Sequence, residues 1–368
     1  MSILIFLIVL VVLIVAHEFG HFIVAKRAGI RVDEFGIGFP PKLFGVQKGE
    51  TAYTVNVLPF GGFVKIFGEN PDEESLRGPD SARSFVNKPK YIQASVIVAG
   101  VFFNILLAWV LFSFGFMSGL PMPVGAAPEG ATLSNPVLVV AGVDGGTPAE
   151  LAGFEAGDRI VALRENGENE TQLDVVSIEN VQSFISPREG TEIAVTVKRG
   201  DELLQKLVVP ALGIVPDKAA IGIAMDMVGT VKLSPPSAVF EGGKLTISLT
   251  WATMKGFGNL IADAFRGTAD LSGIAGPVGI VGLVGDASDF GFVYLLGFVA
   301  IISINLAVLN LVPFPALDGG RLLFLIIEVI KGSPMNPRIV NVIHGVGFIV
   351  LIGLLLLVTY HDIVRLVG

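Results

Sequence analysis

Two histidines and a glutamate lie inside the first hydrophobic segment of the chain. Residues 3–16 are all apolar, and the sequence continues without a break into His17-Glu18-Phe19-Gly20-His21. Positions i and i+4 of a helix share a face, so His17 and His21 can direct two imidazoles at one ion. Ionisable side chains within a membrane span are costly and mark functional sites. The pattern therefore predicts a zinc peptidase centre within or beside a bilayer.

A catalytic zinc site usually takes three protein ligands plus water, so one ligand is missing from this pair. The other two histidines, His344 and His361, lie toward or beyond the last apolar segment. Asp318 directly follows the third apolar segment, which runs inward. His17 lies about 24 Å along the first helix at roughly 1.5 Å per residue, which is the same side of the bilayer. We predict His17, His21 and Asp318 as the Zn²⁺ ligands.

Glu18 is displaced by one residue, about 100° around the helix, from the histidine face. We therefore expect Glu18 to activate the zinc-bound water rather than to bind the ion. It would take a proton from that water, which then attacks the peptide carbonyl, and pass the proton to the leaving amine. Zinc would lower the pKa of the water to about 7 and polarise the carbonyl. The alternative is a buried His/Glu cluster without catalysis.

The composition indicates an integral membrane protein. Of 368 residues, 52% are hydrophobic and only 16% are charged, and the mean hydropathy is +0.72. The net charge of -8 without a dense basic run argues against nucleic acid as a partner. The absence of cysteine excludes disulfides and thiolate zinc ligands. The first segment lacks the basic start and small-residue cleavage site of a signal peptide, so we expect it to be retained.

Four segments are long and apolar enough to span a bilayer, which predicts a polytopic α-helical membrane protein. They lie within residues 1–27 with HExxH, 91–118, 291–321 and 339–361, and in the third region the span covers about 291–312 and the Leu-Asp-Gly motif follows it. Lysine and arginine flank the inner ends of these segments: Lys26, Arg27, Lys88, Lys90, Arg321, Lys331 and Arg338. This distribution predicts both termini outside, a cytoplasmic loop at 28–90, and residues 119–290 on the extracytoplasmic side. The predicted zinc site then lies toward the cytoplasm.

Two further segments are expected to touch the membrane. Residues 51–67 predict a membrane-associated β-hairpin, with strands at 53–58 and 63–66 around a turn at 59–62. In residues 236–264, Ile247, Trp251 and Met254 recur at helical spacing among charged residues. We expect an amphipathic helix at the outer surface there, in preference to a fifth span.

Residues 137–211 predict a small β-rich domain. Gly-Thr-Pro-Ala-Glu-Leu-Ala-Gly at 146–153, followed by Ala-Gly-Asp-Arg-Ile-Val-Ala-Leu at 156–163, resembles a circularly permuted bacterial PDZ domain. Such domains can bind a peptide, including a substrate segment, by adding it as a strand at a sheet edge. The alternative is a PDZ fold that only packs against the membrane part.

Four motifs of the chain resemble those of the site-2 proteases, a family of intramembrane zinc metalloproteases. They are HEFGH at 17–21, LPFGGFVK at 58–65, AGVFFN at 99–104 and NLVPFPALDGG at 310–320. One inserted PDZ domain makes the chain similar to the bacterial RseP type (regulator of sigma-E protease), some members of which carry two. Within AGVFFN, Gly100 and Asn104 are expected to serve close helix packing rather than chemistry.

The resemblance implies an enzyme of the bacterial plasma (inner) membrane. Such enzymes cleave single-span membrane proteins, typically anti-sigma factors or remnant signal peptides, after another protease has shortened them. This step is regulated intramembrane proteolysis. The main alternative is a non-enzymatic membrane adaptor that works through its PDZ domain, and a metal carrier using the same ligands is a third possibility.

A membrane helix must unwind before it can be cut, because its peptide bonds are engaged in its own hydrogen bonds. The predicted hairpin with Gly61 and Gly62 offers a strand edge for the unwound segment. The amide of Asn310 can donate and accept hydrogen bonds to hold it, or can simply join two helices. Pro313 and Pro315 are expected to break the third helix near the site.

Overall fold

The structure is a computed structural model that describes residues 2–70, 72–128, 131–165, 177–200, 202–216, 218–268 and 276–367. The chain divides into two compact units, Met1–Phe114 with Val239–Gly368, and Gly115–Ala238. Residues 166–176 and 201 of the predicted PDZ domain lie outside the described residues.

Four long apolar helices dominate the first unit. They are α1 (Ser2–Arg27), α3 (Lys90–Ser118), α8 (Phe292–Leu311) and α10 (Pro337–Val367). Within the described part of the chain, these are the four helices whose length and composition suit a membrane span. Each of the four predicted spans is therefore a helix that could cross a membrane, which fits a multi-pass membrane protein. The third predicted region is divided, because α8 ends at Leu311 and a separate helix, α9 (Asp318–Lys331), begins at Asp318.

The segment between α1 and α3 forms a small sheet of two long strands, β1 (Val32–Lys48) and β2 (Thr51–Ile66). Residues 34–37 of β1 pair both with residues 52–55 and with residues 62–65 of β2, so they lie between these two parts. The predicted pairing of 53–58 with 63–66 is therefore wrong. The tight turn lies instead between Lys48 and Thr51, which pair with each other, and Gly49 there has a positive φ of 64°.

A hydrophobic cluster fixes this sheet against the second half of α1. Its buried members come mainly from α1, β1, β2 and α3, and include Phe22, Ala25, Val32, Phe35, Val64, Ile66 and Val96. Burial of such side chains is the main favourable contribution to this packing. Phe22 and Ala25 lie within four residues of His21, so the cluster holds β2 beside the HExxH residues.

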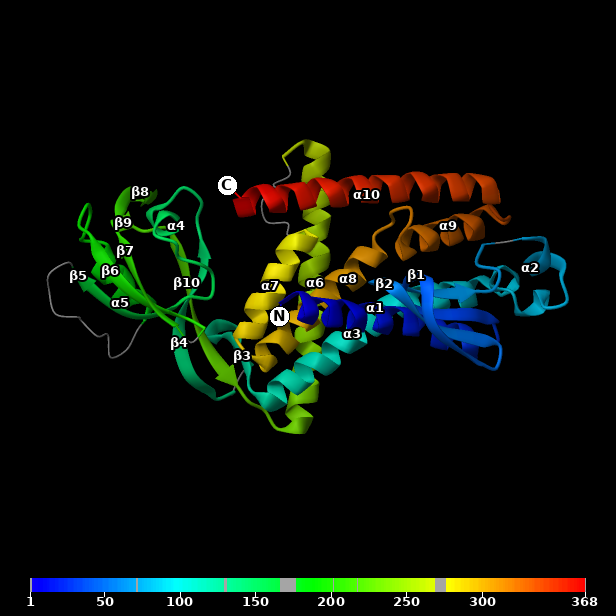
Figure 1. Cartoon of the computed structure of the whole chain (residues 1–368), viewed down its shortest axis with the longest axis horizontal. Helices are drawn as coiled ribbons and strands as arrows, with labels where there is room; N and C mark the ends of the chain where they lie inside the picture. The colour runs from blue at the N-terminus through cyan, green and yellow to red at the C-terminus, as the bar shows by residue number, and fades with distance from the viewer. Residues whose placement is uncertain are drawn as a thin grey trace. The chain divides into compact units, whose positions relative to one another are not determined.

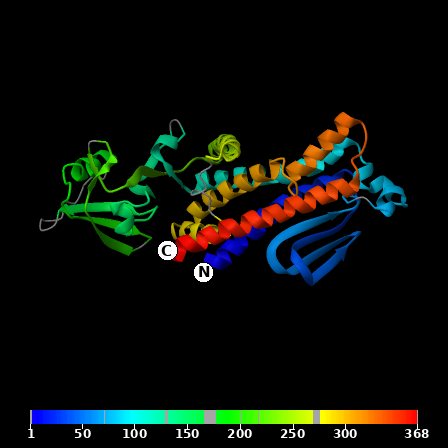
Figure 2. The ribbon, with the colours of Figure 1, turned by 90° about the horizontal axis from the view of Figure 1, so that it is seen from above.

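Five further elements of the described chain complete the first unit, among them α6 (Pro235–Arg266), a helix of 32 residues. They are α2 (Glu73–Arg77), short 3₁₀ turns at Ser81–Arg83 and Phe85–Asn87, α6 and α7 (Pro277–Asp289). Helix α7, which the sequence analysis did not predict, packs through Val284 against Val9 and Leu13 of α1 and Val299 of α8. Figure 1 shows α6 running across the direction of α10, and Figure 2 shows α6 end on. The helix predicted at 236–264 is thus present, and it does not follow the direction of the long helices.

The second unit is built on a six-stranded sheet in the order β3-β10-β4-β5-β6-β7. Its strands are β3 (Leu120–Pro123), β4 (Leu133–Val143), β5 (Arg159–Glu165), β6 (Ile193–Arg199), β7 (Glu202–Val208) and β10 (Ile223–Val231). The unit also contains a 3₁₀ turn at Val124–Ala126, α4 (Pro148–Leu151), α5 (Ile178–Ile185) and the pair β8 (Ala211–Val215) and β9 (Lys218–Ala220). Strand β10 lies inside the sheet, so the folded unit extends beyond residues 137–211.

Candidate metal centre

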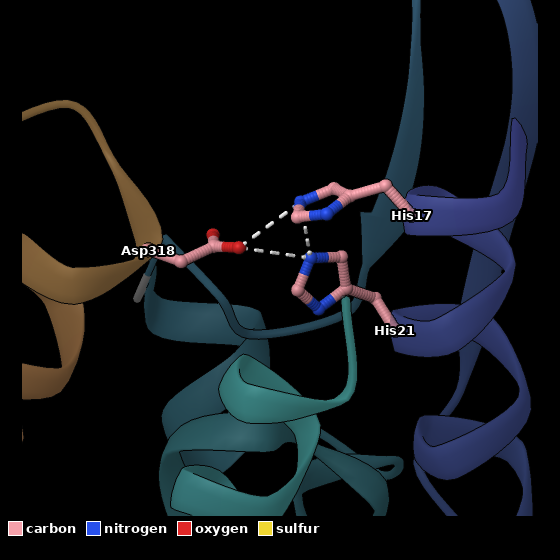
Figure 3. A group of neighbouring side chains, drawn as sticks. All are labelled: His17, His21 and Asp318. Atoms are coloured by element: carbon pink, nitrogen blue, oxygen red, sulfur yellow. Dashed lines mark hydrogen bonds and ion pairs between the residues drawn. The ribbon is translucent and has the colours of Figure 1, made fainter. Parts of the chain in front are cut away.

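His17, His21 and Asp318 meet at one point of the first unit. The Oδ2 atom of Asp318 lies 3.1 Å from Nε2 of His17 and 3.2 Å from Nε2 of His21. The two Nε2 atoms are 3.2 Å apart, and the three side chains point at one another (Figure 3). Three potential ligands from segments about three hundred residues apart in the sequence are thus brought together.

The chemistry of this cluster fits a zinc ion. Oδ2 of Asp318 is buried and has no hydrogen-bond partner, so a negatively charged oxygen faces two ring nitrogens without a satisfying hydrogen bond. Atoms that bind zinc at 2.0–2.2 Å in a tetrahedron lie about 3.3–3.6 Å apart. The observed separations of 3.1–3.2 Å are close to this, and two imidazoles with one carboxylate form a known type of zinc site.

Two glycines allow α3 to approach the histidines closely. A Cβ atom on Gly20 of α1 would lie 2.4 Å from the carbonyl oxygen of Ala99 on α3. A Cβ atom on Gly100 of α3 would lie 2.4 Å from Nε2 of His21 and 2.7 Å from Cε1 of His17. Glycine at position 20 therefore leaves room for the backbone of α3, and glycine at position 100 leaves the space that the imidazoles occupy.

Helix α3 also makes hydrogen bonds to both rings. Nδ1 of His21 is 2.7 Å from the carbonyl oxygen of Val96. A carbonyl only accepts, so Nδ1 carries the proton and Nε2 keeps its lone pair for a metal. Nδ1 of His17 is 3.3 Å from Nδ2 of Asn104. The expectation that Gly100 and Asn104 serve packing alone was therefore incomplete. Their spacing of four residues places both on one face of a helix, and this was the signal in the sequence that both could contact the same neighbouring side chains.

Asp318 is presented by a compact connection between α8 and α9. Ala316 has a positive φ of 79°, which is uncommon outside glycine, and its N–H donates to Nδ1 of His344 at 3.0 Å. Cβ atoms on Gly319 and Gly320 would lie 2.3 Å from the carbonyl oxygens of Val312 and Phe314. The two glycines that follow Asp318 thus let α9 begin tightly against the end of α8.

A cavity of about 360 Å³ opens beside the three side chains. Glu18 lines this cavity together with His17, His21 and Asp318, and the rest of the lining is Phe63–Ile66, Glu69, Asn70, Phe85, Val96, Ile97 and Arg321. Arg321 and Glu69 form an ion pair at its wall. The sequence analysis identified Glu18 but did not single out Glu69 or Arg321 as part of the site.

The described lining of this cavity includes none of the other predicted site residues, which are Gly61, Gly62, Asn310, Pro313 and Pro315. Gly62 lies beside Glu18, because a Cβ atom there would be 3.5 Å from Cγ of Glu18. Pro315 packs on α10, where a Cβ atom on Gly347 would lie 2.5 Å from that of Pro315. Pro313 and Pro315 lie in the connection that separates α8 from α9, as expected.

Comparison with known proteins shows the family to which the chain belongs. The profile of Peptidase family M50 matches residues 5–354. A protein of Clostridium perfringens that its name places among zinc metalloproteases is 36% identical over 353 residues, covering 96% of this chain and 95% of that protein. The regulator of sigma-W protease RasP of Bacillus subtilis is 30% identical over 437 aligned residues, covering 98% of each chain. The chain belongs to peptidase family M50, the site-2 proteases, and is a membrane-bound zinc metalloprotease.

Proposed function

We propose that this enzyme is an intramembrane endopeptidase, with His17, His21 and Asp318 as zinc ligands and Glu18 as the catalytic base. The observation that carries the proposal is the position of the cluster. The three ligand atoms lie within 4.8 Å of one another, and two of them belong to a helix long and apolar enough to span a membrane. Ionisable groups at such a position are costly and are retained for function.

When bound, Zn²⁺ polarises the scissile carbonyl and acidifies water. Glu18 follows His17 directly in α1 and lines the same cavity. It accepts a proton from the attacking water and passes it to the nitrogen of the leaving amine. His17, His21 and Asp318 are held in place by α3 and by the connection before α9, so little reorganisation is needed.

The proposed substrate is a transmembrane segment of a single-span protein, locally unwound. Residues 63–66 of β2 line the cavity, and the described pairing places strand partners for them only on the β1 side. Their free edge suits an extended backbone that needs new hydrogen-bond partners in a dry environment. Gly61, Gly62, Asn310, Pro313 and Pro315 are proposed to bind the same segment on either side of the scissile bond.

The second unit is proposed to be the PDZ domain, centred on residues 137–211 and located outside the cytoplasm of a bacterial plasma membrane. Among its described residues, helices α4 and α5 and the strands at 133–143, 159–165 and 193–199 suit the order read from the sequence. The name of the Bacillus subtilis relative, regulator of sigma-W protease, supports a role in regulated proteolysis of an anti-sigma factor. A peptide or substrate segment would bind at the edge of its sheet.

The test is the Glu18→Gln variant, purified with a single-span membrane substrate. We expect turnover to fall by about 10²–10⁴-fold, because the amide cannot accept the proton, while the zinc content measured by elemental analysis is unchanged. Glu73→Gln on the exposed helix α2 is the matched control and should cleave normally. Turnover of Glu18→Gln equal to that of the control would contradict the role of Glu18.

A further inference from the structure

We infer that Asn104 is a positioning residue for the zinc centre, whose side-chain amide oxygen accepts a hydrogen bond from Nδ1–H of His17. This bond would fix the tautomer in which Nε2 of His17 is free for the ion. The inference rests on the proposed ligand set and assigns to Asn104 a role that helix packing alone does not supply.

One face of α3 is directed at the two histidines. Val96, Gly100 and Asn104 recur every four residues, so they lie on one face of the helix. The carbonyl oxygen of Val96 contacts His21, Gly100 makes room for both rings, and the amide of Asn104 contacts His17. Each position of this face therefore has a contact with an imidazole.

The protonation state of His17 decides which end of the amide must face it. His17 can bind zinc through Nε2, the atom directed at Asp318 and His21, only when the proton is on Nδ1. An N–H requires an acceptor, and an amide nitrogen has none to offer. With Nδ2 facing His17, the buried Oδ1 atom of Asn104 has no hydrogen-bond partner. A half-turn of the amide exchanges the two atoms, so that Oδ1 faces Nδ1 of His17.

The backbone of Asn104 is itself well anchored. Asn104 and Ser303 of α8 are both completely buried, and Oγ of Ser303 donates to the carbonyl oxygen of Asn104 at 2.8 Å. The amide thus projects from a fixed point between α8 and α1. Ligating histidines generally donate their second N–H to such a group, and its loss typically weakens metal binding about 10–100-fold.

The experiment compares two variants of the full-length protein in detergent, Asn104→Asp and Asn104→Leu. Zinc affinity is measured by competition with a chelator. A carboxylate accepts from Nδ1–H and a leucine cannot, so we expect Asn104→Asp to bind zinc within about threefold of the wild type and Asn104→Leu about 10–100-fold more weakly. A packing role predicts the opposite order, because a buried charge disturbs the fold more than a leucine does. That opposite order, or an unchanged affinity in Asn104→Leu, would overturn the inference.

Gln93→Leu is the matched control on the same helix. Gln93 is also a buried amide, but it donates to the carbonyl oxygens of Val86 and Lys88 and not to a histidine. We expect it to lower the unfolding temperature while its zinc affinity stays at the wild-type value. A loss of zinc affinity in Gln93→Leu as large as that in Asn104→Leu would show that general loosening of α3 is sufficient, against the inference.

Two measurements separate failure of this inference from failure of the proposed ligand set. If Asp318→Asn binds zinc as tightly as the wild type, the ligand set is wrong, and the inference falls with it. If Asp318→Asn loses zinc and Asn104→Leu does not, only the role of Asn104 is wrong. In the wild type, the Nδ1–H proton of His17 in ¹⁵N-histidine-labelled protein with zinc should resonate downfield, as for a proton donated to an oxygen; an unbonded position contradicts the inference without any variant.

Discussion

The distance between α1 and α3 at the histidines is set by two residues without side chains. The carbonyl oxygen of Ala99 occupies the position where a Cβ atom of Gly20 would lie, and the imidazoles of His17 and His21 occupy the corresponding space at Gly100. Side chains that hold a metal must be placed to within about 0.5 Å. Residues that contribute only their small size are therefore part of the geometry of this centre.

Gly100→Ala tests this at the residue scale. The added methyl group would lie 2.4 Å from Nε2 of His21, a proposed ligand atom that would have to move. We expect turnover to fall by about 100-fold, since a displacement of about 1 Å at a reacting centre has such an effect, and zinc content to fall with it. Gly353→Ala on α10, where a Cβ atom meets nothing within 4 Å, is the control and should retain both. Equal zinc content in the two variants would argue against the steric role of Gly100.

At the scale of elements, the break between α8 and α9 decides where Asp318, the third proposed ligand, lies. A continuous helix would carry position 318 further along the axis of α8, whereas the connection at 312–317 turns the chain so that Asp318 opens α9. The two prolines and the positive φ of Ala316 account for the break. The N–H of Ala316 is held by His344 of α10, which also contacts Phe324 of α9 at 5.2 Å between ring centroids. Three helices thereby define this turn.

His344→Phe removes the acceptor for Ala316 while keeping an aromatic ring against Phe324. We expect a loss of about 1 kcal/mol in unfolding free energy, the usual net contribution of one hydrogen bond, and lower turnover because the turn lies two residues before Asp318. Thermal unfolding and a cleavage assay measure the two effects. His361→Phe, at an exposed position of the same helix, is the control. If both variants unfold at one temperature and cleave equally, the hydrogen bond does not hold the turn.

At the scale of the whole molecule, the chain combines a membrane unit that contains the site with a β-rich unit inserted between α3 and α6. The positions of lysine and arginine predict that the 28–90 loop and the β-rich unit lie on opposite sides of the membrane. A substrate shortened on one side would then be cut near the other.

Single cysteines test this topology, and the natural chain contains none to interfere. The probe in the 28–90 loop is placed at Glu73, which is exposed on α2. Its neighbour Ser75 is buried and forms a capping box with Asp72, so a cysteine there would not be accessible to the label. We expect Glu73→Cys to react with an impermeant maleimide only in inverted vesicles, and Ser183→Cys only in intact cells. Labelling of both from one side would refute the arrangement.

The features that could be predicted from the sequence are those encoded by residues close together in the chain. The i, i+4 spacing of His17 and His21, the apolar runs long enough to span a bilayer, and the prolines before Asp318 need only neighbouring residues to be interpreted. These features led to the multi-pass class and the zinc metalloprotease family. The same local reasoning placed a hairpin turn at Gly61-Gly62, where two consecutive glycines gave a stronger turn signal than Gly49-Glu50.

Only the tertiary structure decided what surrounds these residues. The pairing of residues 34–37 with two parts of β2, the packing of α7 on α1, and the contacts of α3 with the imidazoles join positions far apart in the chain. His21 and Val96 are 75 residues apart, and His17 and Asn104 are 87 residues apart. Such contacts depend on the register and distance between packed helices and strands. Those are properties of the assembled unit, and no single segment of the sequence carries them.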